Sequence, residues 1–246
     1  MKKRIKRGLV FNKLSNMVYD IKKLKRTIET KSGVIQVTDG TEYWHNAINM
    51  VNNSFLGTVS GIEDQENSRG SRVGDQIHLI GVTFAMMLEL NERYSDVTFR
   101  SMVIRSAKGD TPTTAKLWNR ASGNKMLDTF NTERFSVLYT KYVKMTAPNM
   151  RIQSAGPTNQ ITGSGFTQGT VNTQQSRATC IVKFLVPGKK FTRIGILQYE
   201  NNIQQVKIFD YHFMICAYSN FSTSELLGFN VGRLNDCHIK THYKDA

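Results

Sequence analysis

The sequence predicts an all-β protein, an eight-stranded single jelly-roll sandwich preceded by a basic N-terminal amphipathic helix. Short runs of apolar and polar residues recur from about residue 34 onward, and long, uneven loops separate them. Helical periodicity extends over most of the first 31 residues instead. With 246 residues the chain is long enough for one such domain with a full core. We therefore divide it into a helical arm, residues 1–31, and a jelly-roll domain, residues 32–246.

The arm carries most of the positive charge. It holds eleven Lys or Arg against two acidic residues, a net charge of +9 out of +14 for the whole chain. Such a segment is expected to bind a polyanion, with nucleic acid preferred over an anionic membrane surface. A mitochondrial presequence is the alternative, although the arm is poor in Ser and contains Asp20 and Glu29. The residues predicted to bind nucleic acid are Lys2, Lys3, Arg4, Lys6, Arg7, Lys13, Lys22, Lys23, Lys25 and Arg26.

An apolar seam runs along the arm at heptad spacing. Its members are separated alternately by four and three residues, which is the spacing of a helix edge that packs against a partner. Gly33 is the expected stop after the helix. Two arrangements remain open: the helix packs on its own domain, or identical helices from neighbouring subunits form a small bundle. The seam residues are Val10, Leu14, Met17, Ile21, Leu24 and Ile28.

Eight strands are expected after the arm. Each segment is rich in β-branched, aromatic or long apolar residues. Within 96–107 the alternation slips near Ser101, which predicts a β-bulge. The expected strands are residues 40–51, 78–90, 96–107, 134–146, 179–188, 193–200, 206–219 and 226–243.

Two connections between these strands have a distinct composition. Residues 114–122 predict a short helix. Residues 152–176 contain no charged side chain and are dominated by Gly, Thr, Gln, Asn and Ser. Because predicted strands flank this segment on both sides, we expect a long surface loop rather than a linker between domains.

Catalytic motifs are missing from the sequence, and we expect no enzyme. Three widely spaced cysteines argue against a disulfide framework, and Cys180 and Cys216 fall within apolar strands as core residues. The glycine-rich residues 163–169 do not have the spacing of a dinucleotide loop. No apolar run reaches the roughly 18 residues of a membrane span.

Metal binding has weak support in the sequence. His238 and His242 would share one face of a helix, but their segment predicts a strand, with both histidines on one side. The acidic residues 61–66 lack the spaced oxygen donors of a known calcium loop, and a solvated acidic turn is preferred.

Three successive segments resemble coat proteins of the satellite tobacco necrosis virus type. This jelly-roll group also includes capsid proteins of small circular single-stranded DNA viruses such as geminiviruses. The first carrying feature is "RVGDQ" (72–76), which enters a long strand. A strand with Arg100 and Arg105 follows, then "GDTPT" (109–113) and "ERFSVL" (133–138). The "VPG" turn at 186–188 also fits, and the similarity covers about residues 57–190.

The resemblance implies a capsid protein, sixty copies of which form a T=1 icosahedral shell with the basic arm facing the genome. It implies location in the virion, with assembly in the host nucleus or cytoplasm. A single-stranded genome is expected, DNA rather than RNA, because the loops are long as in the DNA-virus relatives. Some relatives bind calcium between subunits, partly through a carboxylate near the C-terminus, where Asp245 stands here. Calcium therefore stays open, and no other cofactor or membrane partner is expected.

Two alternative functions also remain, and a lectin-like or enzymatic jelly roll ranks after the first. A nucleic-acid-binding protein that forms no capsid would use the basic, heptad-bearing helix much as a dimeric DNA-binding helix does. The basic stretch ahead of the seam, residues 2–7, is short for that geometry.

Overall fold

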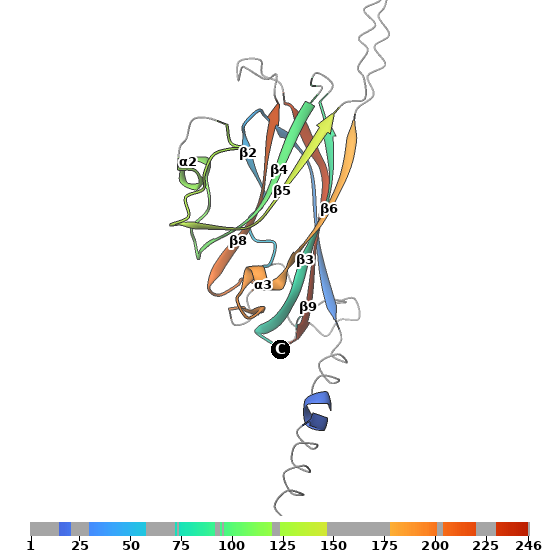
Figure 1. The fold of residues 1–246 in the computed structure, drawn as a ribbon, viewed down its shortest axis with the longest axis vertical. Helices are drawn as coiled ribbons and strands as arrows, with labels where there is room; N and C mark the ends of the chain where they lie inside the picture. Colours follow the sequence, from blue (N-terminus) through green and yellow to red (C-terminus); the bar gives the residue numbers. More distant parts are fainter. Residues whose placement is uncertain are drawn as a thin grey trace, which may run out of the picture.

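The computed structural model describes residues 15–20, 30–57, 72, 74–91, 94, 96–119, 124–146, 178–200, 204–219 and 230–245. These residues fold mainly into two antiparallel β-sheets that face each other (Figure 1), so the predicted all-β class is confirmed. Among the described residues, no helix has the length and apolarity needed to cross a bilayer.

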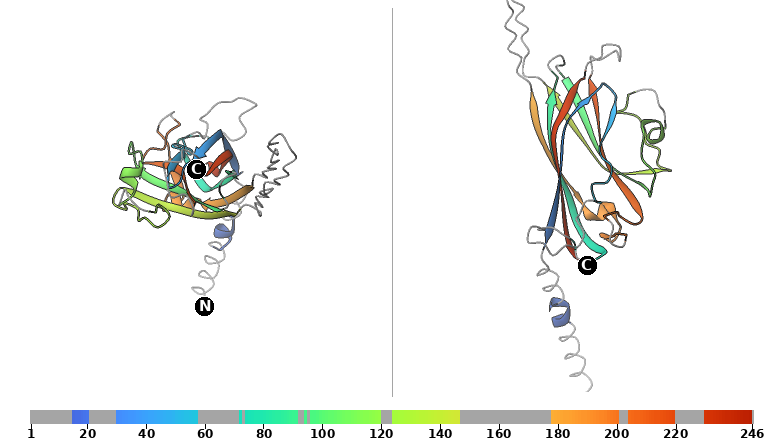
Figure 2. Two further views of the ribbon diagram at one scale, coloured as in Figure 1. Left: turned by 90° about the horizontal axis from the view of Figure 1, so that it is seen from above. Right: turned by 180° about the vertical axis from the view of Figure 1, so that it is seen from behind.

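The two sheets are built from strands that are mostly distant in sequence. In spatial order, sheet A contains β1 (Lys31–Tyr43), β9 (Gly232–Asp245), β3 (Gln76–Leu90) and β6 (Thr179–Pro187), and the short β7 (Ile196–Gln198) also pairs with β3. Sheet B contains β2 (Ile48–Asn52), β8 (Phe209–Ser219), β4 (Asp96–Ala107) and β5 (Phe135–Thr146). The chain therefore passes repeatedly from one sheet to the other, as the views in Figure 2 show.

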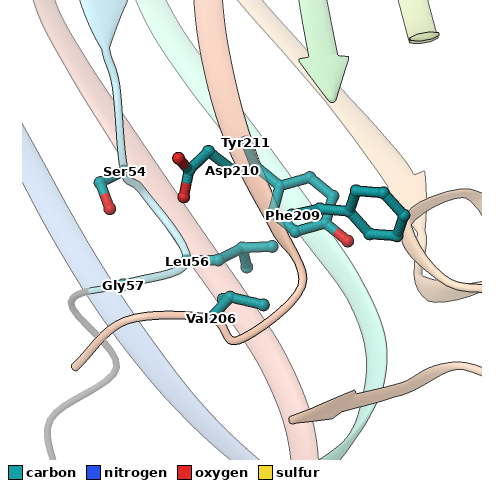
Figure 3. Close-up of a pocket in the computed structure, with 7 residues that line it drawn as sticks. All are labelled: Ser54, Leu56, Gly57, Val206, Phe209, Asp210 and Tyr211. Carbon is teal, nitrogen blue, oxygen red and sulfur yellow. The ribbon is translucent and has the colours of Figure 1, made fainter. Parts of the chain in front are cut away.

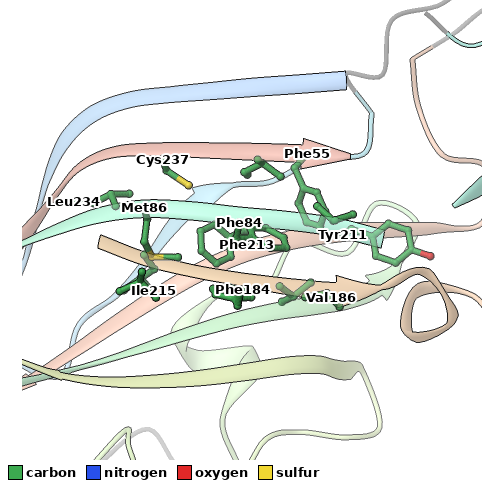
Figure 4. Packing of buried hydrophobic residues seen from close by; sticks show 14 of the residues in the cluster. Phe55, Phe84, Met86, Phe184, Val186, Tyr211, Phe213, Ile215, Leu234 and Cys237 are labelled. Atoms are coloured by element: carbon green, nitrogen blue, oxygen red, sulfur yellow. The ribbon is translucent and has the colours of Figure 1, made fainter. Parts of the chain in front are cut away.

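The main core fills the space between the sheets, because alternate residues of each strand point inward. The ring of Phe84 on β3 stacks on Phe184 of β6 at 5.0 Å between centroids, and it lies 4.7 Å from the ring of Phe213 on β8. These three rings form an aromatic cluster that joins the two sheets (Figure 4). Other residues packed in this core include Phe55, Met86, Val186, Ile215, Leu234 and Cys237.

A second apolar cluster covers part of the outer side of sheet B. Leu117 and Trp118, from the connection between β4 and β5, pack there with Met102 and Ile104 of β4. This connection includes α2 (Thr114–Leu117), a single turn within the predicted helix 114–122. β4 is consequently buried on both sides.

This double burial explains why the predicted bulge near Ser101 is wrong. Apolar residues occupy both sides of β4, so its alternation breaks without a change in backbone geometry. β4 pairs with β8 in continuous register. The register shift occurs against β5 instead, between Val103 and Ile104, where β5 accommodates the extra residue Leu138.

Other expected boundaries also differ from the structure. The strand expected at 40–51 is two strands, β1 and β2, because the chain turns at residues 44–47, where Asn46 has a φ of 59°. Gly33 does not follow a helix; it lies in β1 opposite Thr241. The described residues therefore contain nine strands rather than eight. One further helical turn, α3 (Gly188–Phe191), occupies a position where a simple turn was expected.

Three predicted features lie outside the described residues. They are the surface loop 152–176, the glycine-rich residues 163–169 within it, and the acidic residues 61–66.

Candidate nucleic-acid interface

Most of the predicted arm lies outside the described residues, and Met17 is the one seam residue that the structure describes. Residues 15–20 form a helical turn whose residues are all exposed, and Met17 is 63% exposed. Met17 is therefore not buried against the sandwich. The residues outside the described part are Lys2, Lys3, Arg4, Lys6, Arg7, Lys13, Lys22, Lys23, Lys25 and Arg26 of the predicted binding set, and Val10, Leu14, Ile21, Leu24 and Ile28 of the seam.

The arm leads directly into sheet A. β1 begins at Lys31, which lies opposite Tyr243 of β9. The Lys31 ammonium is 2.7 Å from a carboxylate oxygen of Asp245, so the start of β1 is held to the end of β9. Asp245, the residue considered as a calcium ligand, is thus in an ion pair within its own chain. The chain that precedes β1 enters the sandwich at an edge strand of sheet A.

The outward side of sheet A carries lysines and histidines. Outward positions alternate with core positions along β3, β6 and β9. Cations at these positions face away from the core and toward any ligand that lies on the sheet. We call this surface the basic face, and its residues are His78, Lys183, His238, Lys240, His242 and Lys244.

The strand register brings these side chains together from distant parts of the chain. Ala85 of β3 lies between His238 of β9 and Lys183 of β6. In the next outward position Thr83 lies beside Lys240. Because strands are about 4.8 Å apart, His238 and Lys183 stand roughly 10 Å apart at the backbone. Small side chains on the intervening strand leave the surface between the cations open.

Two acidic groups of sheet A near the basic face are paired among the described residues. A carboxylate oxygen of Glu89 is 2.8 Å from Nε of Arg233, and one of Asp236 is 3.2 Å from Nε2 of His238. Lys183 and Lys240 are exposed and have no salt-bridge partner among the residues that the structure describes. The centre of the face therefore has an excess of positive charge, which phosphate groups would neutralise.

His242 is sensitive to this excess of charge. Its Nε2 is 3.0 Å from the hydroxyl oxygen of Thr83. Burial lowers the pKa of His242, and the positive charges of Lys240 and Lys183 lower it further. His242 is therefore a neutral imidazole at pH 7 in the free protein.

Arg100, on the outer side of sheet B, has a different role from the lysines of the basic face. It is only 5% exposed, and its guanidinium lies 4.6 Å from the centre of the Phe130 ring and 5.1 Å from that of Trp118. It donates hydrogen bonds to the carbonyl oxygens of Lys125 and Met126. Burial lowers the pKa of Arg100, but a guanidinium remains charged. Arg100 therefore holds the β4–β5 connection on the sheet.

A small hollow, with a cavity volume of about 10 Å³, lies beside the start of β8 (Figure 3). Its polar groups are engaged within the protein: Asp210 accepts a 2.7 Å hydrogen bond from the Gly109 amide, and the Tyr211 hydroxyl donates to the carbonyl of Phe191. The hollow is smaller than the usual pocket for a small organic ligand. It is lined by Ser54, Leu56, Gly57, Val206, Phe209, Asp210 and Tyr211.

The cysteines are structural. Cys216 and Cys237 are fully buried, and burial raises the pKa of each thiol to about 12. They remain protonated thiols near pH 7 and are poor nucleophiles. Cys180 is half-buried against the main core. Within the described ranges, no group of three or more His, Cys, Asp or Glu side chains is arranged to hold a metal ion.

The sequence predicts nucleic-acid binding by the arm, and the basic face was not among the predicted binding residues. It did predict that His238 and His242 share one side of a strand, and this is confirmed in β9. A further signal was present, because residues 238, 240, 242 and 244 are all His or Lys at strand spacing. No protein-family model matches this chain, and a search of curated proteins finds no significant match.

Proposed function

We propose that this chain is the coat protein of a small virus, a single jelly roll that assembles into a closed T=1 shell of sixty copies around a single-stranded genome. DNA is favoured over RNA. The observation that carries the proposal is that the cationic arm is joined to the same sheet whose outward side carries further cations. The arm, with a net charge of +9, precedes an edge strand of sheet A, and the outward side of the same sheet presents Lys183 and Lys240. Both elements would contact one enclosed polyanion.

The strand order supports the jelly roll. Apart from the short β7, the strands form the orders β1-β9-β3-β6 and β2-β8-β4-β5. The successive pairs β1 and β2, β3 and β4, β5 and β6, and β8 and β9 are each divided between the two sheets. Two Greek keys wound into one eight-stranded sandwich produce this alternation, and viral capsid domains are among the proteins that use it.

Exposed apolar residues at both edges of sheet A support self-association. Ile181 and Leu185, the outward neighbours of Lys183 along edge strand β6, are 79% and 55% exposed. Val34, on the opposite edge strand β1, is 60% exposed. Edge strands with exposed apolar side chains are prone to pair with another chain. Different patches at opposite edges are what a head-to-tail contact between identical subunits requires, and such contacts close into rings.

Aspartate at the β6 edge is expected to block assembly without unfolding the subunit. The Ile181→Asp, Leu185→Asp double variant places two charges where a neighbouring copy would bury apolar surface. Sedimentation velocity should show single subunits at concentrations where the wild type forms particles, with a thermal midpoint close to that of the unassembled wild type. The matched control is Leu127→Asp with Ile208→Asp, because these residues are 81% and 57% exposed and lie outside the edge strands β1 and β6. Normal particles from the edge variant would contradict this interface.

Neutralising the basic face is expected to weaken nucleic-acid binding by a salt-dependent amount. The plot of log K against log salt has a negative slope, and each phosphate that the protein no longer neutralises makes it less steep by about 0.7 for a single strand. Lys183→Gln with Lys240→Gln should therefore make the slope less steep by about 1.4. Titration of oligothymidylate at several salt concentrations measures the slope. Lys141→Gln with Lys207→Gln removes the same charge from exposed positions outside the basic face. Equal slopes in the two double variants would exclude a specific role for the basic face.

The proposal as a whole is tested on the purified full chain. We expect closed particles by negative-stain microscopy, with nuclease-protected nucleic acid inside, and digestion of the extracted nucleic acid by DNase or RNase identifies its type. Single subunits that bind nucleic acid but never assemble would favour the alternative, a binding protein that forms no capsid. Single subunits at every ionic strength, without affinity for polynucleotides, would refute both functions.

A further inference from the structure

Three of the five histidines of this chain lie on the basic face. They are His78, His238 and His242. The other two serve the fold: the His45 ring lies 4.8 Å from the Tyr218 ring at a tilt of 42°, and the buried His212 is hydrogen-bonded to Ser106 at 2.8 Å. The arm, residues 1–31, contains no histidine. Histidines are therefore concentrated on the face that carries Lys183 and Lys240.

The surroundings of His242 are cationic. Lys240 and Lys244 are its nearest outward neighbours along β9, and Lys183 acts on it from β6. On β3 it lies opposite Gly81, which offers no side chain, and its Nε2 contacts the Thr83 hydroxyl. On β1 it lies opposite Ser32. None of these groups carries a negative charge that would stabilise an imidazolium.

The surroundings of the other two histidines are mixed. Asp236 lies 3.2 Å from Nε2 of His238, with Lys240 two residues along β9 and Gln36 opposite on β1. Lys183 is across the intervening Ala85. His78 lies opposite Lys244 of β9 and Ile196 of β7.

We propose that the basic face binds nucleic-acid phosphates together with protons, so that it holds a strand more tightly as the pH falls from about 7.5 to about 5.5. A phosphate between Lys183 and Lys240 would be joined by the imidazolium form of His242, with His238 beside it on β9. The inference rests on the proposed function, since it takes the packaged nucleic acid as the ligand of this face.

The coupling follows from charge. In the free protein burial lowers the pKa of His242 below its usual range, and the positive charges of Lys240 and Lys183 lower it further. A bound phosphate offsets the lysine charges and favours the imidazolium, so the pKa of His242 rises on binding. Solvent supplies the proton, and the protonated ring gains a second N–H donor. By linkage, a rise of one pKa unit corresponds to about a tenfold gain in affinity at pH values below both pKa values.

Binding of a fluorescent oligothymidylate to the full chain at constant salt tests this inference. The wild type should bind several-fold more tightly at about pH 5.5 than at about pH 7.5, with the full gain of about tenfold reached only below the pKa of His242 in the free protein. His238→Gln with His242→Gln should remove most of this gain while keeping the affinity measured at the higher pH. His45→Gln removes a histidine outside the basic face and should keep the gain. Calorimetry in buffers of different ionisation enthalpy should show proton uptake on binding near pH 6.5 in the wild type and much less in the double variant.

The outcomes separate this inference from the function on which it rests. Affinity that does not change with pH, or a gain that persists in the double variant, overturns proton coupling and leaves shell assembly intact. A full chain that neither assembles nor binds at either pH overturns both proposals. Fluorescence of the buried Trp118 checks that each variant is folded at each pH.

Discussion

Deleting residues 2–26 is expected to leave folded subunits whose particles contain little nucleic acid. The deleted segment holds ten of the eleven arm cations and one acidic residue, so each subunit falls from +14 to +5. Sixty intact copies carry on the order of 800 positive charges, and the deletion leaves about a third of them to neutralise phosphates. Both apolar clusters are built from residues after 34, and the described residues Met17 and Tyr19 of the arm are exposed. The core residues that the structure describes thus lie outside the deleted segment, and we expect the fold to survive the deletion.

Nuclease-protected nucleic acid per milligram of particle measures this effect, and a melting curve checks the fold. A second variant that changes the ten deleted cations to Gln keeps the length of the arm and tests its charge alone. We expect both variants to package poorly. Packaging at the wild-type level by either one would remove the arm from the packaging mechanism.

Phe84→Ala is expected to cost about 3–5 kcal/mol of unfolding free energy. Phe84 is fully buried and contacts the rings of Phe55, Phe184 and Phe213, so its loss leaves a cavity at the junction of the two sheets. Denaturant unfolding measures the change. Because assembly would add stability by mass action, the comparison is made in the Ile181→Asp, Leu185→Asp background.

The control for Phe84→Ala is Met17→Ala, which truncates a side chain that is 63% exposed. Surface truncations of this kind change stability by less than about 0.5 kcal/mol. A loss below about 1 kcal/mol in Phe84→Ala would mean that this aromatic group does not hold the two sheets together.

Strand positions were the best predicted feature of the fold, because the two-residue period of a strand is a local property. The segments 78–90, 96–107, 134–146 and 179–188 match β3, β4, β5 and β6 to within two residues at each end. The prediction at 40–51 was wrong because the turn between β1 and β2 has no proline or glycine. It depends on Asn46, a residue that tolerates positive φ.

The error at Ser101 has a tertiary cause. Alternation marks a strand with one polar side, but the β4–β5 connection folds back over β4 and buries its outer side as well. Met102 and Ile104 are apolar because they pack against Leu117 and Trp118, which are 13 or more residues further along the chain. No local pattern contains that information.

The sequence by itself determined the charge of the arm, the all-β class and the burial of Cys216, since charge and short-range periodicity can be read from neighbouring residues. The tertiary structure alone decided that Lys183 and His238, which are 55 residues apart, share one surface. The strands that carry these two residues both pair with β3. Which residues lie opposite each other on strands distant in sequence depends on how the whole sheet assembles. For the same reason, the basic face was visible in the sequence only as alternate cations along β9.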